Sequence, residues 1–249
     1  MVPPDARVRT RQRKLILQDT PQSPPIRNAA TVIVVRDRGG APSVLMGQRG
    51  AKAAFMASKF VFPGGAVDPE DGLIPFASSL PQPCAARLAE DSPLGTAEAL
   101  IGAAIRELWE ETGQILGRPG AWDRPVPADW QTYADRGMVP SAEGLQFVFR
   151  AITPPGRPRR FDARFFMIDA DYLVTDPDDF SDAGGELSHL QWIPLPEVRR
   201  FDLPFITEVV LAEIAADLRS DAPPASVPFY RDRDEDIHFA RLGGSSPLA

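Results

Sequence analysis

The ten residues from Ala104 to Gly113 constrain this chain more than any other run. They contain three glutamates, Glu107, Glu110 and Glu111. On an α-helix, positions i, i+3 and i+4 lie on one face within about one turn. Like charges stacked in this way repel, and each close pair destabilises an isolated helix by roughly 0.2–0.5 kcal/mol. The run therefore predicts a helix whose acidic face needs a compensating charge.

A hard divalent cation would supply that charge, because magnesium and manganese prefer carboxylate oxygens and accept several at once. The opposite face of the predicted helix is apolar and would anchor it in a core. Its residues are Leu100, Ala104, Leu108 and Ile115. Gly113 suits the left-handed residue that commonly ends a helix. The alternative is a solvated acidic face that binds nothing.

A glycine pair lies upstream, within the segment from Phe62 to Asp71. An extended apolar run at residues 59–62 leads into Gly64 and Gly65. Because glycine has no Cβ, the backbone there can approach a ligand without obstruction. This segment is the second candidate element of a binding site.

Together the two elements resemble the signature of the Nudix hydrolases. That signature is glycine, five residues, glutamate, seven residues, and then Arg-Glu-x-x-Glu-Glu-x-Gly. Gly65 matches the opening glycine, and residues 106–113 match the second half. Two departures stand out. Asp71 occupies the position of the usual glutamate, and 34 residues, 72–105, stand where the signature has seven.

The long insertion resembles the split signature of the subgroup related to coenzyme A diphosphatases. The resemblance runs from about residue 29 to residue 218. It implies an α/β fold, a Nudix-type α/β/α sandwich around a mixed β-sheet. It also implies a metal-dependent hydrolase that cuts the diphosphate bond of a nucleoside diphosphate linked to a second group, with coenzyme A or acyl-coenzyme A as the favoured substrate.

The resemblance assigns roles to individual residues. Glu110 and Glu111 become the chief ligands of Mg²⁺ or Mn²⁺, and Glu107 becomes a ligand or the general base. The carbonyl of Gly65 completes the shell, and Arg106 orients the glutamates through ion pairs. Gly64 and Gly65 also line the substrate site.

Other candidates leave two interpretations open. Glu186, in a glycine-rich loop before a strand, is either an additional carboxylate ligand or base, or a solvated residue. Asp71 either holds a metal through water or caps a turn, and we favour the structural role. Arg160 and Arg164 are predicted to bind substrate phosphates, because a guanidinium matches them bidentately. A charged hairpin tip is the alternative.

The alternation of apolar and polar residues predicts strands at 30–35, 43–48, 145–152, 161–168 and 190–193. Helices are predicted at 84–90 and 205–218 as well as around the acidic run. Strands distributed between helices favour an α/β sandwich. The expected organisation is an N-terminal arm at 1–28, a Nudix domain at 29–218 with an inserted segment at 72–95, and a C-terminal extension at 219–249.

The inserted segment is expected to act as a lid or a substrate-selecting wall, because it joins two halves of one site. A surface excursion without function is the alternative. Its apolar residues suit contact with an uncharged part of a substrate, and they are Leu73, Ile74, Phe76 and Leu80. On this view, a short linker in place of residues 73–92 would leave a folded protein.

Composition narrows the possible partners. The net charge of −7 argues against a nucleic-acid-binding protein, since such domains are usually basic. A single cysteine and two histidines make an internal disulfide or a thiolate–imidazole zinc site untenable. No apolar run approaches the roughly 20 residues of a membrane span. We expect a cytoplasmic protein, as a monomer or homodimer, whose partner is a small-molecule nucleotide.

Two further functions stay open from the sequence. One keeps the chemistry and changes the substrate to ADP-ribose, a dinucleotide or a nucleotide sugar. The other is a Nudix-fold sensor that binds a nucleotide without cutting it. Three intact and mutually repelling glutamates argue against the sensor, because a site without catalysis has no need of them.

Overall fold

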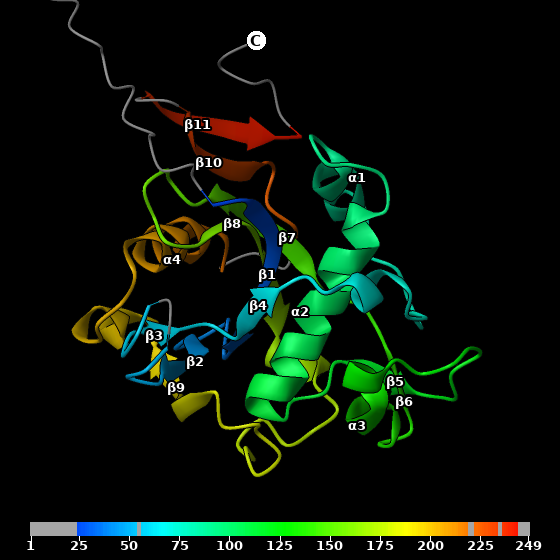
Figure 1. Ribbon diagram of the computed structural model, residues 1–249. Helices are drawn as coiled ribbons and strands as arrows, with labels where there is room; N and C mark the ends of the chain where they lie inside the picture. Colours follow the sequence, from blue (N-terminus) through cyan, green and yellow to red (C-terminus); the bar gives the residue numbers. More distant parts are fainter. Residues whose placement is uncertain (1–23, 54–55, 219–221, 234–235, 244–249) are drawn as a thin grey trace, which may run out of the picture.

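A nine-stranded mixed sheet forms the centre of the molecule (Figure 1). The computed structural model describes residues 24–53, 56–218, 222–233 and 236–243. The strand order is β11-β10-β7-β8-β1-β2-β3, with β4 paired to β1 and β9 to β2. The β1–β8 and β7–β10 pairs are parallel, and the others are antiparallel. Most of the predicted N-terminal arm, 1–28, lies outside the described residues.

The five predicted strands are present as β1, β2, β7, β8 and β9, within a few residues at each end, and four further strands complete the sheet. Their bounds are β1 Ile26–Arg36, β2 Ser43–Arg49, β3 Phe60–Val61, β4 Gly64–Ala66, β7 Gln146–Ile152, β8 Arg160–Asp169, β9 Leu187–Pro194, β10 Val227–Arg233 and β11 Asp236–Leu242.

Alternate residues of β1 enter two different hydrophobic cores. Val32 and Val34 pack into a core with α1 (Cys84–Ala89) and α2 (Thr96–Thr112). Ile33 and Val35 pack into a second core with α4 (Phe205–Asp217). A strand buried on both faces requires this continuous apolar sequence. The predicted α/β/α sandwich is therefore confirmed.

Helix α2 has the predicted anatomy. Leu100, Ala104 and Leu108 are completely buried on its core face. Gly113 ends the helix with φ of 73°, and its N–H donates to the carbonyl of Trp109 at 2.7 Å. A positive φ of this kind is the reason for glycine at the helix end.

The connector after α2 forms a small module of its own. It contains β5 (Gly117–Pro119), which pairs with β6 (Met138–Pro140), and the short helix α3 (Gln131–Ala134). Trp130 is fully buried in this module and lies 5.8 Å from Trp122, ring centre to ring centre. These two tryptophans pack the connector against the main core.

The inserted segment contributes to the main core. Its predicted short helix exists as α1, but Ile74, Leu80 and Leu88 are all buried in the core that contains α2. Of the apolar residues expected to face a substrate, Leu73 alone is well exposed. This burial corrects the expectation that a linker in place of residues 73–92 would leave the fold intact.

A hairpin that the sequence did not predict extends the sheet beyond residue 218. Strand β10 pairs in parallel with β7, so that Phe229 lies opposite Arg150. The guanidinium carbon of Arg150 lies 4.2 Å from the centre of the Phe229 ring. Phe229 is 2% exposed, whereas Phe239 on the outer strand β11 is 38% exposed. The hairpin thus covers β7 and part of the core.

The exposure difference predicts different costs for two matched substitutions. F229A should lower the free energy of unfolding by about 3–5 kcal/mol, because it removes a buried aromatic ring and leaves a cavity. F239A should lower it far less. Urea unfolding followed by circular dichroism measures both. Equal effects would mean that the hairpin is not packed as described.

Candidate active site

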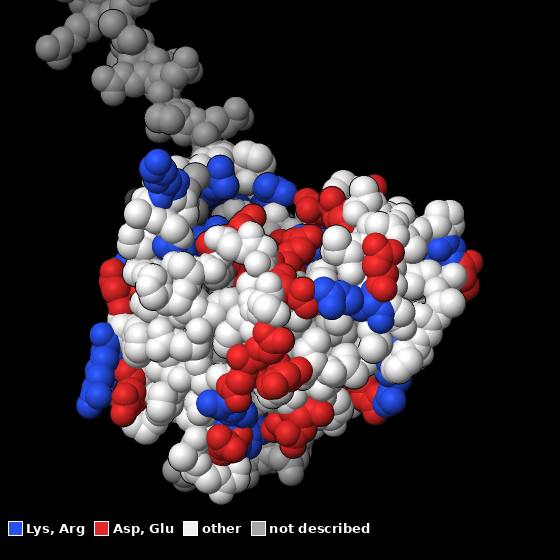
Figure 2. Space-filling model, turned by 90° about the horizontal axis from the view of Figure 1, so that it is seen from below, with Lys and Arg blue, Asp and Glu red and all other residues white. Residues whose placement is uncertain are grey.

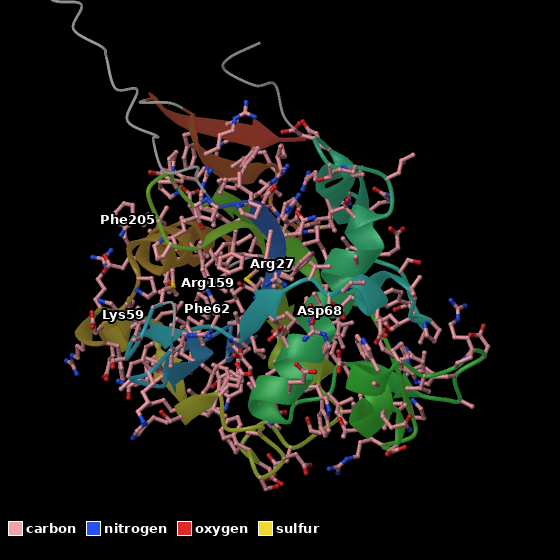
Figure 3. The ribbon with its side chains drawn as sticks, in the orientation of Figure 1. Arg27, Lys59, Phe62, Asp68, Arg159 and Phe205 are labelled. Carbon is pink, nitrogen blue, oxygen red and sulfur yellow. The ribbon has the colours of Figure 1, made fainter. Side chains whose placement is uncertain are left out.

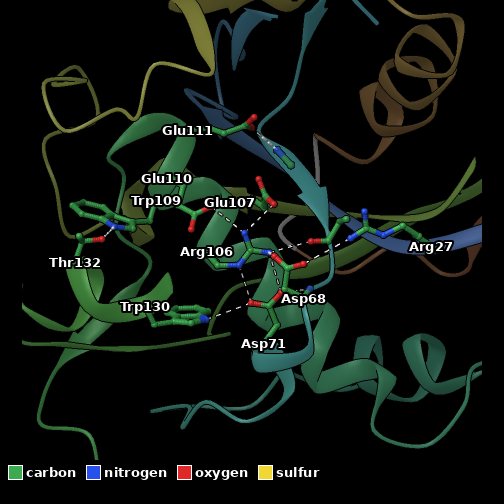
Figure 4. Close-up of polar contacts among 12 residues, drawn as sticks. Arg27, Asp68, Asp71, Arg106, Glu107, Trp109, Glu110, Glu111, Trp130 and Thr132 are labelled. Atoms are coloured by element: carbon green, nitrogen blue, oxygen red, sulfur yellow. Dashed lines mark hydrogen bonds and ion pairs between the residues drawn. The ribbon is translucent and has the colours of Figure 1, made fainter. Parts of the chain in front are cut away.

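Glu107 and Glu111 of α2 lie against the glycine pair of β4, whereas Glu110 lies beside Arg106 (Figure 4). The N–H of Gly64 donates to Glu111 Oε2 at 2.8 Å. A Cβ on Gly65 would lie only 2.1 Å from Glu107 Oε1. Strand β4 therefore needs glycine at position 65, because the carboxylate of Glu107 occupies the space of a side chain. The structure brings together the two elements that the sequence singled out.

Arg106 connects most of the acidic groups. Its Nε and Nη2 donate to the two oxygens of Asp71 at 2.9 and 3.0 Å. Its Nη1 donates to Glu107 at 3.0 Å and to Glu110 at 2.9 Å, and Nη2 also reaches the carbonyl of Ala66 at 3.0 Å. Burial disfavours the charged guanidinium, but these carboxylates outweigh it and raise the pKa of Arg106. The predicted orienting role fits this geometry.

Asp71 is a structural residue. It is 1% exposed, and besides Arg106 it accepts hydrogen bonds from Trp130 Nε1 at 3.3 Å and from the N–H of Asp68 at 2.8 Å. A Cβ on Gly102 would lie 2.3 Å from the carbonyl oxygen of Asp71, so α2 packs directly on this turn. The structural interpretation of Asp71 is supported.

The negative charges of Glu107 and Glu111 are less well compensated than that of Glu110. Burial raises the pKa of Glu111 to about 8, with repulsion from Glu107 adding to the effect. Burial likewise raises the pKa of Glu107 to about 7 against the attraction of Arg106. Glu186 repels both of these carboxylates, whereas Glu110 interacts mainly with Arg106. Glu107, Glu111 and Glu186 therefore share one region of negative potential.

Glu186 reaches this region from a loop that packs on the end of α2. The N–H of Gly184 donates to the carbonyl of Glu110 at 2.7 Å, and a Cβ on Gly184 would lie 2.7 Å from that same oxygen. The glycine-rich sequence before β9 therefore permits the close approach that places Glu186 beside the other glutamates. Glu186 itself is exposed.

These donors suit a hard divalent cation. All are carboxylate or carbonyl oxygens, which is the donor set of magnesium and manganese. Among the described residues, no three histidine, cysteine or acidic side chains are already gathered as a complete ligand group. Arg106 holds Glu110 and Glu107, so ligation by all three glutamates of α2 requires side-chain rotation. The uncompensated repulsion around Glu111 favours that rotation toward a cation.

Acidic side chains are also prominent on the face of the molecule at the end of α2 (Figure 2). The loop before Glu186 contributes Asp176, Asp178, Asp179 and Asp182, all of them exposed. An anionic substrate meets electrostatic resistance at such a face. A bound cation would remove much of this resistance near the glutamates.

The predicted arginines lie apart from the glutamates. Arg164 is 1% exposed, and its Nη1 donates to Asn28 Oδ1 at 2.7 Å and to the carbonyl of Asp162 at 2.9 Å. Burial lowers its pKa to about 10. The prediction that Arg164 binds substrate is corrected, because its guanidinium is enclosed by these partners. Arg160 lies at the rim of a pocket at the start of β1 and β8.

Two residues near the site were missed by the sequence analysis. Arg49, at the end of β2, lies 4.0 Å from Glu111 and is the cation nearest to it in the structure as described. Trp130 donates to Asp71 from the connector module. No local motif marks either residue, because each reaches the site through long-range pairing.

Comparison with known proteins now defines the family. The NUDIX domain profile matches residues 25–214, so the chain belongs to the Nudix family. A solved Nudix hydrolase from Alicyclobacillus acidocaldarius has a TM-score of 0.58 and 27% identity, covering 77% of this chain and 92% of that one. The prediction of a Nudix fold and family is confirmed.

Two curated relatives match this chain over about half of their own length. The acyl-coenzyme A diphosphatase NUDT19 of Gallus gallus is 31% identical over 62% of this chain and 54% of its own. A nudix hydrolase of Caenorhabditis elegans is 28% identical over 60% of this chain and 46% of its own. The chain thus spans about half the length of these relatives. Within the described ranges, no helix is long and apolar enough to cross a membrane.

The buried Asp71–Arg106 pair and an exposed Asp–Arg pair offer a matched test. D71A should cost about 3–5 kcal/mol of folding free energy, because it leaves the buried Arg106 with too few partners. D123A breaks the exposed pair between Asp123 and Arg124 and should cause no measurable change. Urea unfolding of both variants is the measurement. A stable D71A would show that Asp71 does not hold Arg106.

Proposed function

We propose that this chain hydrolyses the diphosphate bond of a nucleoside diphosphate linked to a second group, with coenzyme A or acyl-coenzyme A as the favoured substrate. The observation that carries the proposal is the arrangement of Glu107 and Glu111 against Gly64 and Gly65 in a member of the Nudix family. The choice of substrate rests on the similarity to the Gallus gallus acyl-coenzyme A diphosphatase and on the split signature.

Glu107, Glu110, Glu111 and the carbonyl of Gly65 would hold Mg²⁺ or Mn²⁺. Such an ion neutralises phosphate charge and makes a water molecule more acidic. Arg106 keeps the carboxylates of Glu107 and Glu110 in place, and the N–H of Gly64 does the same for Glu111.

We assign the base to Glu186. It is exposed, and in the described structure it has no hydrogen bond or ion pair. Water attacks one phosphorus, the bridging P–O bond breaks, and Glu186 takes the proton of the water.

The alternative substrates are ADP-ribose, dinucleotides and nucleotide sugars, which present the same diphosphate bond. A nucleotide sensor without catalysis is a weaker candidate. It gives no reason for the buried Glu111 beside the half-buried Glu107, because the burial and mutual repulsion of these carboxylates cost folding free energy.

The direct test is incubation of the purified chain with magnesium and a panel of these compounds, with products identified by mass spectrometry. We expect cleavage of coenzyme A that stops with excess EDTA. E111Q should lower kcat about 10²-fold or more, on the scale of losing one electrostatic stabiliser. E98Q is the matched control, because Glu98 is an exposed residue of the same helix, and it should leave kcat unchanged. Full turnover in EDTA would refute the mechanism.

A second test uses two glycines of the same region. G65A should reduce kcat at least about 10²-fold, because the new methyl group displaces Glu107 and a small misplacement at a catalytic group has that effect. In G72A the methyl group would meet only Ala99, with its Cβ nearest at 3.4 Å, so the kcat of this variant should stay near that of the parent. Steady-state kinetics and thermal unfolding separate lost geometry from lost folding. Unchanged kcat in a folded G65A would contradict the position assigned to Glu107.

A further inference from the structure

An open pocket of about 270 Å³ lies where β1 and β8 begin. Three arginines line it together with Phe161 and three prolines. The arginines are Arg27 on β1, Arg159 on the β7–β8 loop and Arg160 on β8. The residue pairing of the parallel strands, with Arg160 opposite Ile26, brings these distant parts of the sequence together.

The pocket is rich in unused positive charge. Within the described residues, Arg159 has no hydrogen bond or ion pair, and Arg160 donates only from Nε, to the carbonyl of Thr153 at 3.0 Å. Arg27 has one acidic neighbour, Asp68, at 3.7 Å. Asp68 is in turn shared with Arg106 at 3.5 Å. One carboxylate therefore balances part of the charge of several guanidinium groups.

The pocket is connected to the catalytic glutamates through Asp68. Figure 3 shows Arg27 between Arg159 and Asp68, and Figure 4 shows Asp68 between Arg27 and Arg106. Only the side chain of Asp68 separates Arg27 from Arg106, which holds Glu107 and Glu110. A ligand whose diphosphate lies at the glutamates can thus extend a second anionic group toward the pocket.

We propose that this pocket binds a phosphomonoester on the nucleoside part of the substrate, a group separate from the diphosphate that is cut. Guanidinium groups bind phosphate oxygens bidentately, and the proline walls hold the loop backbone at fixed φ. The inference rests on the proposed function and deepens it. Coenzyme A carries such a group on its ribose, whereas ADP-ribose does not, so the pocket distinguishes the two substrate classes.

The test compares coenzyme A with 3′-dephospho-coenzyme A, which differ by that single phosphomonoester. The parent protein should show a higher kcat/KM for coenzyme A. R159A/R160A should lower the ratio of the two kcat/KM values about 10-fold, on the scale of losing charge-assisted hydrogen bonds. The loss should appear in KM, because the pocket contributes binding away from the reacting atoms.

R157A is the matched control, because Arg157 is exposed on the same loop but does not line the pocket. It should leave the ratio unchanged. A parent ratio near one, or an unchanged ratio in R159A/R160A, overturns the inference while leaving the proposed hydrolysis intact.

A binding experiment covers the case in which neither compound is cut. Calorimetric titration then compares adenosine 3′,5′-bisphosphate with adenosine 5′-monophosphate on the parent and on R159A/R160A. Tighter binding of the bisphosphate that is lost in the double variant supports the pocket even where the proposed hydrolysis has failed. Equal affinities in the parent overturn it.

Discussion

The buried guanidinium of Arg106 is the interaction on which the rest of this site depends. A buried charge costs several kcal/mol unless its partners are complete and well placed. Here every nitrogen of Arg106 has an acceptor, drawn from the turn at Asp71, from β4 at Ala66 and from α2 at Glu107 and Glu110. These partners fix the distance between the helix and the glycine pair. Both carboxylate oxygens of Asp71 accept hydrogen bonds from Arg106, and Oδ1 also accepts one from Trp130. A side chain shorter than glutamate is therefore sufficient at this position.

The inserted segment separates Asp71 from Arg106 in sequence, yet the two are joined by two hydrogen bonds. The close packing of Gly102 on the Asp71 carbonyl brings α2 onto the turn. Ile74, Leu80 and Leu88 bury apolar surface between these two ends, and each contributes on the order of 1.5–3 kcal/mol. The insertion is thus part of the scaffold that holds the pair together.

Local patterns made the helix, most strands and the glutamate–glycine site predictable, because periods of 3.6 and 2 residues are visible in sequence. Contacts set by long-range pairing were not. Arg164 looked available for phosphate, but Arg150 and Asp162 on neighbouring positions of β7 and β8 enclose it in a buried network. Strand β10 was missed because Pro228 and its charged residues hide the apolar alternation. Arg49 reaches Glu111 only because β2 ends beside the start of β9.

The glutamates of α2 divide into two electrostatic environments. Both Glu110 and Glu111 lie in the last turn, where the helix dipole disfavours negative charge, but Glu110 pairs with Arg106 at 2.9 Å, whereas the nearest guanidinium to Glu111 in the described structure is 4.0 Å away. Glu111 receives one N–H from Gly64 and a distant guanidinium from Arg49, and these do not offset burial and the repulsion of Glu107. The core face of α2 supplies the burial that keeps such a helix folded. The uncompensated negative charge is concentrated at Glu107 and Glu111, which face the backbone of Gly64 and Gly65. A small and hard cation therefore fits this space better than the side chain of a further arginine would.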